Sequence, residues 1–283
     1  MEIQAVLRRI HLYSPQPQAM ADFYAQAYAM SITPLNDSLI CRNADRELGL
    51  SRGVAHQLKY ALFALTSESA WQAFLSRTQR SQHEDLSALA ELPEGSVGFK
   101  DPDGNLIVFC PPTDAPPAAH RGTPHAPEAA LPEAKLQHFA LRTQNIEAMV
   151  RFYTEQLGYV LSDRVQDEQG QLKACFLRTD RLHHAMALFS APVTCFDHQS
   201  YETSDWNQLK TWADHMGAQR KTIVWGIGRH GPGNDVFFMI QDPDGNLAEI
   251  SSEIEVCPPE RPMGIWRHEE RTLNLWGKAI MRS

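Results

Sequence analysis

Two short sequences occur twice in this chain in the same order, and their repetition decides the fold. Ala19-Met-Ala-Asp-Phe-Tyr24 returns as Ala148-Met-Val-Arg-Phe-Tyr153, and Asp101-Pro-Asp-Gly-Asn-Leu106 returns as Asp242-Pro-Asp-Gly-Asn-Leu247. The first pair is offset by 129 residues and the second by 141, so the second copy is about 12 residues longer. Two matches in order at a similar offset indicate the duplication of a domain-sized unit.

The segment between the two copies has the composition of a linker. Pro111–Pro132 reads PPTDAPPAAHRGTPHAPEAALP, and no apolar period of a strand or helix runs through it. We therefore divide the chain into an N-terminal domain, a linker, a C-terminal domain and a tail, at residues 1–112, 113–132, 133–255 and 256–283.

Each copy is predicted to contain two strand–helix–strand–strand–strand units. In the second copy, an apolar strand at Leu136–Leu141 precedes a helical apolar period over Ile146–Leu157, with Gly158 as the helix C-cap. The second unit starts with a strand near Phe196–Glu202, and Ser204 or Asp205 caps its helix, which ends at Gly217. Further strands are expected at Tyr159–Arg164, Leu172–Arg178, His184–Phe189, Val236–Gln241 and Asn246–Ser251.

Composition and charge exclude several classes of protein. Of 283 residues, 43% are hydrophobic and 21% charged, which is typical of globular domains. The formal net charge of −8 disfavours a surface for nucleic acid or anionic membrane. No apolar stretch approaches the roughly 20 residues that span a bilayer, and the N-terminus lacks the apolar segment of a signal peptide. The five cysteines contain no C-x-x-C pair, so we expect a reduced, cytoplasmic protein without a disulfide framework.

Three residues of the second copy have the chemistry of a half-open metal site. His138 and His198 lie in the first strands of consecutive units, so a twofold-like pairing of the units brings them together. Glu249 lies in a strand that otherwise reads as buried, where a carboxylate requires a cation. Two imidazoles and one carboxylate leave coordination positions open, which favours Fe(II), or Mn(II), with oxygen ligands. A single strand histidine is more often a hydrogen-bonded core or surface residue than a ligand, and Glu249 alone is equally compatible with a half-exposed position.

A longer ordered series of motifs resembles the type I extradiol ring-cleavage dioxygenases of the vicinal oxygen chelate superfamily. The resemblance covers nearly the whole chain and implies an α+β fold of two tandem vicinal oxygen chelate domains. Each domain would consist of paired βαβββ modules forming a curved, partly open barrel, with metal only in the C-terminal one. The series is His138-Phe-Ala-Leu, His183-His184, Asp197-His198-Gln-Ser-Tyr, Gly228-Arg-His230-Gly-Pro-Gly-Asn234 and Asp242-Pro-Asp-Gly-Asn-Leu-Ala-Glu249.

The resemblance implies Fe(II)-dependent extradiol, or meta, cleavage of a catechol-type aromatic diol in the catabolism of aromatic compounds. His138, His198 and Glu249 would hold Fe(II), with Mn(II) as the alternative. The implied partners are a small aromatic diol and O2, and the implied assembly is a homo-oligomer, without nucleic acid or membrane.

Two further histidines receive catalytic roles from the same resemblance. His184 matches a residue beside oxygen, where an imidazolium stabilises negative charge and delivers a proton. His230 matches a residue near the substrate hydroxyl, as a base or hydrogen-bond partner. The alternative for His183-His184 is a pair at the start of a strand, and the alternative for His230 is a polar loop.

The expected substrate contacts are Met239, Asn234 and Phe176. Met239 stands ten residues before Glu249, where the family usually has a tyrosine that hydrogen-bonds the substrate. A thioether cannot donate a hydrogen bond, so the change is expected to slow cleavage or alter the substrate, unless Met239 only packs the pocket. Other aromatic residues that either line the pocket or belong to the ordinary core are Phe196, Tyr201 and Phe238.

The rest of the chain leaves alternatives open. In the N-terminal copy Val108 stands where Glu249 stands in the second copy, and His11 alone cannot build a site. In the tail, Leu273, Leu275 and Trp276 either cover the active site or anchor a surface segment. The alternative function is a non-oxygenase vicinal oxygen chelate protein, either a metal-dependent lyase or isomerase or a metal-free ligand-binding protein. A metal set confined to one half favours the dioxygenase.

Overall fold

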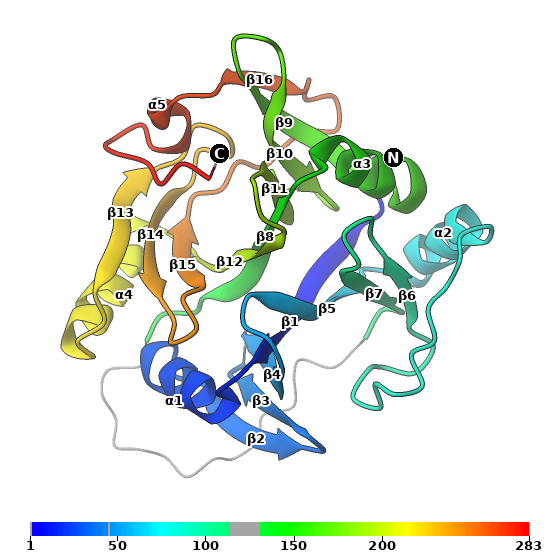
Figure 1. The fold of residues 1–283 in the computed structure, drawn as a ribbon, viewed down its shortest axis with the longest axis horizontal. Helices are drawn as coiled ribbons and strands as arrows, with labels where there is room; N and C mark the ends of the chain where they lie inside the picture. Colours follow the sequence, from blue (N-terminus) through cyan, green and yellow to red (C-terminus); the bar gives the residue numbers. More distant parts are fainter. Residues whose placement is uncertain (1, 45, 114–130, 283) are drawn as a thin grey trace.

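The computed structural model describes residues 2–44, 46–113 and 131–282, which form one sheet in each half of the chain (Figure 1). Most of the predicted linker lies outside the described residues. The elements of the N-terminal half are β1 (Ala5–Ser14), α1 (Pro17–Ala27), β2 (Ser31–Leu35), β3 (Ser38–Arg42), β4 (Glu47–Arg52), β5 (Gln57–Leu65), α2 (Glu68–Thr78), β6 (Val97–Lys100) and β7 (Leu106–Cys110).

The C-terminal half is longer and ends in a tail that adds a strand to its sheet. Its elements are β8 (Lys135–Thr143), α3 (Ile146–Arg151), the π-helical turn η1 (Phe152–Leu157), β9 (Val160–Gln166), β10 (Leu172–Arg178), β11 (Met186–Ser190), β12 (Cys195–Thr203), α4 (Trp206–Ala218), β13 (Ile223–Arg229), β14 (Val236–Gln241), β15 (Leu247–Ser252), β16 (Gly264–Arg267) and α5 (Glu270–Leu273).

In each half two units meet through their first strands, which confirms the predicted α+β fold of paired units. β1 pairs with β5 and β8 with β12, both antiparallel, and the other strands extend each sheet outward. The sheet orders are β2-β3-β4-β1-β5-β7-β6 and β13-β14-β15-β12-β8-β11-β10-β9-β16. Three units have three strands after the helix; in the described residues of the unit that starts at β5, only β6 and β7 follow α2.

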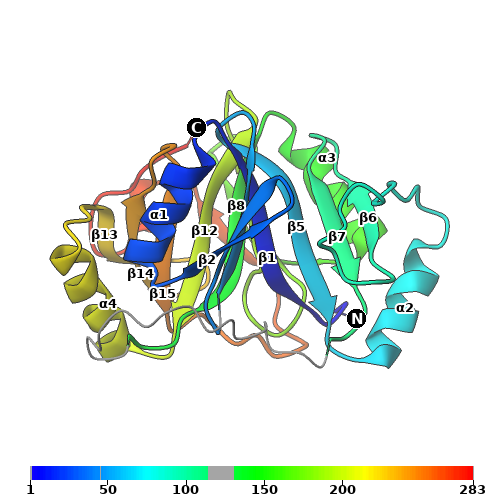
Figure 2. The same cartoon turned by 90° about the horizontal axis from the view of Figure 1, so that it is seen from below.

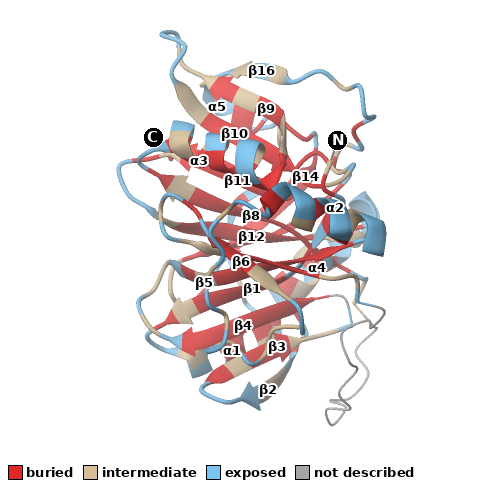
Figure 3. Ribbon diagram, turned by 90° about the vertical axis from the view of Figure 1, so that its right-hand side faces the viewer, coloured by how far each residue is buried: buried red, intermediate tan, exposed pale blue. Residues whose placement is uncertain are grey.

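The two sheets share one hydrophobic core. The four first strands lie at the centre of the molecule, between helices α1 and α4 on one side and α2 and α3 on the other (Figure 2). Phe63 of β5 packs against Phe139 of β8, with ring centroids 6.3 Å apart. Buried residues fill the central strands, while the edge strands β2 and β16 and the outer faces of the helices are exposed or partly exposed (Figure 3). Among the described residues, no helix is long and apolar enough to cross a membrane.

The helix ends follow the predicted capping residues. Gly158 ends the α3–η1 helix with a φ of 85°, a left-handed conformation that costs glycine little. The side chain of Asp205 accepts hydrogen bonds from the backbone N–H groups of Asn207 and Gln208 at the start of α4. α4 continues to Ala218, one residue beyond its predicted end.

The two repeated sequences contact each other across the halves. The hydroxyl of Tyr24 donates to Asp242 Oδ2 at 3.1 Å, and the hydroxyl of Tyr153 donates to Asp101 Oδ2 at 2.8 Å. Each Phe-Tyr helix of one copy is therefore anchored to the Asp-Pro-Asp-Gly turn of the other copy. The fourth residue of each turn is a glycine with positive φ, 87° in the first copy and 90° in the second.

Candidate metal centre

Three side chains from neighbouring strands converge in the C-terminal half. His138 on β8, His198 on β12 and Glu249 on β15 meet because these strands are adjacent in the sheet. The Nε2 atoms of the two histidines are 3.2 Å apart, and Glu249 Oε2 lies 3.7 Å from His138 Nε2 and 3.6 Å from His198 Nε2. All three side chains are buried. The structure thus brings together the three residues expected to be metal ligands.

Hydrogen bonds on the outer side of each imidazole decide which nitrogen faces the centre. His198 Nδ1 donates to Asp197 Oδ1 at 2.6 Å, and His138 Nδ1 donates to Gln137 Oε1. The Gln137 amide is oriented by its own bond from Nε2 to the carbonyl oxygen of His184 at 2.5 Å. With each Nδ1 protonated, both Nε2 atoms carry lone pairs that face each other, as in histidines that bind a metal.

Glu249 supplies the observation that tests whether a metal fits. Its side chain is fully buried, and neither carboxylate oxygen has a hydrogen-bond partner in the described part of the chain. Burial raises the pKa of Glu249 well above its ordinary value, and the nearby carboxylate of Asp235 raises it further. An unpartnered carboxylate facing two imidazole lone pairs is costly without a cation. The donor set therefore fits a divalent metal ion.

Asp235 is a second buried carboxylate beside this centre, and sequence reasoning missed it. Its carboxylate lies in one group with His230 and Glu249, whose ligand atoms are all within 4.8 Å of one another. Neither of its oxygens has a hydrogen-bond partner among the described residues. Burial raises its pKa to about 7. Together, Glu249 and Asp235 carry the negative charge that one divalent cation would balance.

His184 faces the centre from the loop before β11. Its ring centroid is 4.3 Å from that of His138, and its Nδ1 is 3.0 Å from Nδ1 of His183. His183 Nε2 is in turn 3.2 Å from Asp163 Oδ2. Burial holds the pKa of His184 well below its ordinary value, and His138 lowers it further. The arrangement favours a neutral imidazole over the imidazolium that the family resemblance suggested.

His230, directly after β13, also lines the pocket. Its Nδ1 donates to the carbonyl oxygen of Leu273 at 2.5 Å, and its ring stacks on Phe237 with centroids 3.7 Å apart. Its Nε2, 4.0 Å from Glu249 Oε1, is therefore a hydrogen-bond acceptor. Burial lowers the pKa of His230 to about 3, which keeps this nitrogen unprotonated.

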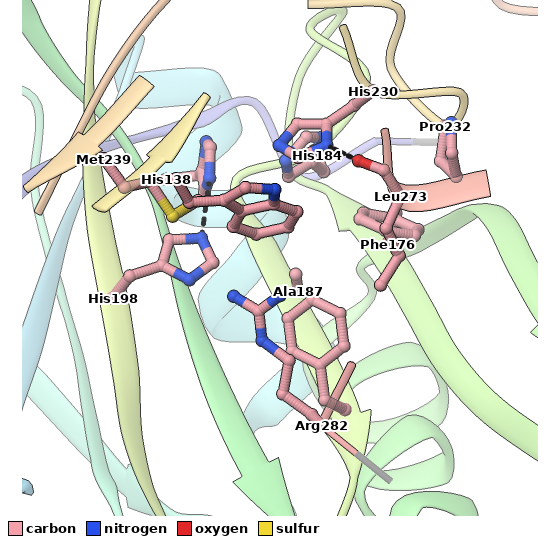
Figure 4. A pocket seen from close by; sticks show the side chains of 12 residues that line it. His138, Phe176, His184, Ala187, His198, His230, Pro232, Met239, Leu273 and Arg282 are labelled. Carbon is pink, nitrogen blue, oxygen red and sulfur yellow. Dashed lines mark hydrogen bonds between the residues drawn. The ribbon is translucent and has the colours of Figure 1, made fainter. Parts of the chain in front are cut away.

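These groups line one end of an apolar pocket (Figure 4). Met239, paired with Glu249 across β14 and β15, and Phe176 line it as expected. Asn234 does not line this pocket: it has a left-handed φ of 58° at a turn and is exposed. The remaining apolar lining residues are Ala187, Phe189, Trp225, Pro232 and Leu273. Of these, only Leu273 was singled out from the sequence.

The other aromatic candidates face away from the pocket. Phe196, Tyr201 and Phe238 belong to the large core between the sheets, whereas Phe176 and Met239 belong to a separate cluster around the pocket. The alternation of side chains along a strand explains the difference, because neighbours such as Phe238 and Met239 point to opposite faces.

The tail contributes one expected and one unexpected residue to the pocket. Leu273 lines the pocket, but Leu275 and Trp276 remain 37% and 53% exposed. Arg282, which sequence reasoning missed, lines the pocket and binds Asp197 through Nη2 at 2.9 Å and Nε at 3.2 Å. The adjacency of Asp197 to His198 was a usable signal, but nothing in the sequence marked Arg282.

In the N-terminal half, side chains occupy the position that corresponds to the metal centre. Arg9, which precedes His138 by the repeat offset of 129, donates to the Tyr60 hydroxyl at 2.9 Å and forms a buried ion pair with Glu47. His11 hydrogen-bonds Ser51 Oγ at 2.8 Å. A guanidinium therefore fills the space that a metal would take in the other half.

Comparison with known proteins points to one superfamily. Residues 135–250 match the Glyoxalase/Bleomycin resistance protein/Dioxygenase superfamily. Metapyrocatechase 2 of Cupriavidus necator is 27% identical over 93% of this chain and 86% of its own length. Two crystal structures share the fold. The Mn(II)-bound glyoxalase from Novosphingobium aromaticivorans has a TM-score of 0.76 at 22% identity and covers 99% of this chain and 93% of its own. Homoprotocatechuate 2,3-dioxygenase from Brevibacterium fuscum, in complex with 3,4-dihydroxyphenylacetate, has a TM-score of 0.75 at 20% identity. The match covers 98% of this chain and 89% of the dioxygenase chain.

Proposed function

Because residues 135–250 form a domain of the Glyoxalase/Bleomycin resistance protein/Dioxygenase superfamily, we propose that this enzyme performs extradiol cleavage of a catechol-type diol with O2. The observation that carries the proposal is the buried convergence of His138, His198 and Glu249 at the end of an apolar pocket. The similarity to a metapyrocatechase over 93% of the chain supports the same reaction class. The five unpaired cysteines agree with a reduced, cytoplasmic location, which we also propose.

His138, His198 and Glu249 would hold Fe(II), or Mn(II), through two Nε2 atoms and a carboxylate oxygen. A metal held in this way supplies open positions for both diol oxygens and O2 and lets electron density pass from the ring to oxygen. Glu249 and Asp235 balance the charge of the divalent ion. The protein's other tasks are to hold the ring, move protons and exclude water.

The apolar walls hold the aromatic ring and leave few polar contacts to orient it. Phe176 and Trp225 offer faces and edges to a ring, and Met239 packs beside the metal ligands without donating a hydrogen bond. Leu273 and Trp225 cover the pocket on the side of the tail and so help to keep water out.

His230 and His184 are the residues that we assign to proton transfer. His230 Nε2 is an acceptor, because Nδ1 is committed to Leu273, and it is placed to take the proton of a diol hydroxyl. We assign the N–H of His184 Nδ1 as the donor to His183 Nδ1, 3.0 Å away. This assignment leaves His184 Nε2 to accept a proton and return it to the opening ring.

An oxygen-uptake and absorbance assay tests the function. The protein is purified anaerobically, loaded with Fe(II) or Mn(II), and offered catechol, alkylcatechols, 2,3-dihydroxybiphenyl and a dihydroxynaphthalene. We expect a yellow ring-opened product with one O2 consumed per diol. Bound metal without turnover of any diol would overturn the dioxygenase assignment and favour a lyase or isomerase. Absence of metal binding would favour a ligand-binding protein.

A further inference from the structure

The C-terminal tail supplies outer partners to the active-site histidines from three separate positions. Trp266 Nε1 donates at 2.7 Å to Asp163, the carboxylate beside His183, and the carbonyl of Leu273 binds His230. The third position is Arg282, the penultimate residue, which reaches a chain segment 85 residues earlier. Arg282 alone among the three acts on a carboxylate that directly holds an expected metal ligand.

The side chain of Arg282 is buried and held by several contacts. Its side chain is 2% exposed, and its guanidinium lies over the rings of Phe189 and Trp225 at 4.7 and 4.8 Å. Two of its nitrogens, Nε and Nη2, bind different oxygens of Asp197, and Nη1 donates to the carbonyl of Ile280 at 2.7 Å. Figure 4 shows the guanidinium on the same side of the pocket as His198.

The contact to Asp197 is what joins the tail to the metal centre. Asp197 Oδ1 accepts from both His198 Nδ1 at 2.6 Å and Arg282 Nη2 at 2.9 Å. The other oxygen accepts from Arg142, whose side chain is 30% exposed, at 2.6 Å. A bidentate hydrogen bond from a guanidinium fixes the plane of a carboxylate, whereas one hydrogen bond leaves the carboxylate free to rotate. Arg282 therefore sets the carboxylate plane that directs the ring of His198.

We propose that Arg282 is a positioning residue for His198, so that seating of the tail over the pocket and orientation of the metal ligand are one event. The proposal rests on the proposed metal site but not on its reaction. By thermodynamic reciprocity, a tail that favours the metal-binding orientation must itself be held more firmly when metal is bound. A tail that only covered the pocket would show neither effect.

Metal affinity is the decisive measurement. We compare the wild type with Arg282→Ala, Arg282→Lys, Asp197→Asn and the Ala/Asn double variant, in chelator competition with Mn(II) or Fe(II). Arg271→Ala, an exposed tail arginine, is the matched control. Loss of a partner behind a metal-binding histidine typically weakens binding 10- to 100-fold, and we expect this for Arg282→Ala. Arg282→Lys keeps the charge without the bidentate hydrogen bond and should restore metal affinity only in part.

The following results distinguish the proposal from its alternatives. If Arg282 acts through Asp197, Arg282→Ala does not weaken metal affinity further in the Asp197→Asn background. Bound metal should then slow hydrogen exchange of residues 278–282 in the wild type but not in Asp197→Asn. Affinity within twofold of wild type for Arg282→Ala, or effects of the two substitutions that multiply, would overturn the proposal. A wild type that binds no divalent metal would overturn the metal site with it. Binding without ring cleavage would overturn only the proposed reaction.

Discussion

Replacing Glu249 by glutamine is expected to shift metal affinity and the stability of the metal-free protein in opposite directions. The substitution keeps the shape of the side chain and removes its charge. In the presence of metal, it takes away the one charged ligand of a buried cluster. Breaking a buried ionic pair costs about 3–5 kcal/mol, so we expect metal binding to weaken by roughly two to three and a half orders of magnitude.

The metal-free protein should respond the other way. Glu249 is fully buried with both oxygens unpartnered among the described residues, and leaving such a group unsatisfied costs about 1–3 kcal/mol. The glutamine amide can donate to the lone pairs of His138 Nε2 and His198 Nε2, which lie 3.7 and 3.6 Å from Glu249 Oε2. Because the pKa of Glu249 is raised, its carboxylate destabilises the fold increasingly as pH rises, and the gain from glutamine should grow with pH.

Two measurements separate these effects. Chelator competition reports the metal affinity, and urea unfolding in EDTA, followed by circular dichroism, reports the free energy of unfolding without metal. Glu253→Gln is the matched control, because Glu253 lies at the surface in an ion pair with Arg229 at 2.6 Å. Metal affinity within threefold of wild type would refute the role of Glu249 as a ligand. A metal-free variant less stable than wild type would show that Glu249 is instead a structural carboxylate.

Three further predictions test the pocket, the contact between the halves and the response to pH. Met239→Tyr places a hydroxyl donor in the pocket and should raise the rate of ring cleavage several-fold in steady-state assays; an unchanged or lower rate would show that no donor is missing at this position. Tyr153→Phe removes the buried bond to Asp101 and should lower the free energy of unfolding in urea by about 1.5–3 kcal/mol, whereas a change under about 0.5 kcal/mol would contradict that bond. Burial raises the pKa of Glu202 from 4.5 to about 7, so the folded protein holds a proton that the unfolded chain releases in this range. Its contribution to stability should therefore fall by at most about 1.4 kcal/mol per pH unit between these values, and Glu202→Gln should flatten the decline in unfolding experiments across pH; parallel pH profiles would disprove the assignment.

Much of the C-terminal half could be predicted because its signals are local. The apolar strand at β8 and the caps at Gly158 and Asp205 depend only on nearby residues. The unit pattern required a strand between α4 and β14, but β13 was not located, since its conformation depends on pairing with β14 and its sequence is interrupted by two glycines. The unit that starts at β5 lacks a strand in its described residues, which the repeat alone did not indicate.

The candidate site divides in the same way. His138, His198 and Glu249 were identifiable because the duplicated units place the first strands together, and a carboxylate in an apolar strand stands out. Asn234, expected to contact substrate, lies outside the pocket lining, because a motif does not indicate which way a loop residue points. Asp235, the next residue, is buried beside the metal centre, and the motif did not indicate this orientation either.

The sequence by itself determined the duplication, the paired α+β units and the residues able to bind a divalent metal, since these follow from repetition, periodicity and side-chain chemistry. Only the tertiary structure decided which groups stand behind those residues. Asp197 is adjacent to His198 in sequence, but its partner Arg282 is 85 residues away. Arg9 and Tyr60, which close the corresponding place in the N-terminal half, are separated by 51 residues. No local pattern encodes such contacts, because they arise when sheet pairing and the return of the tail bring distant side chains into one buried space.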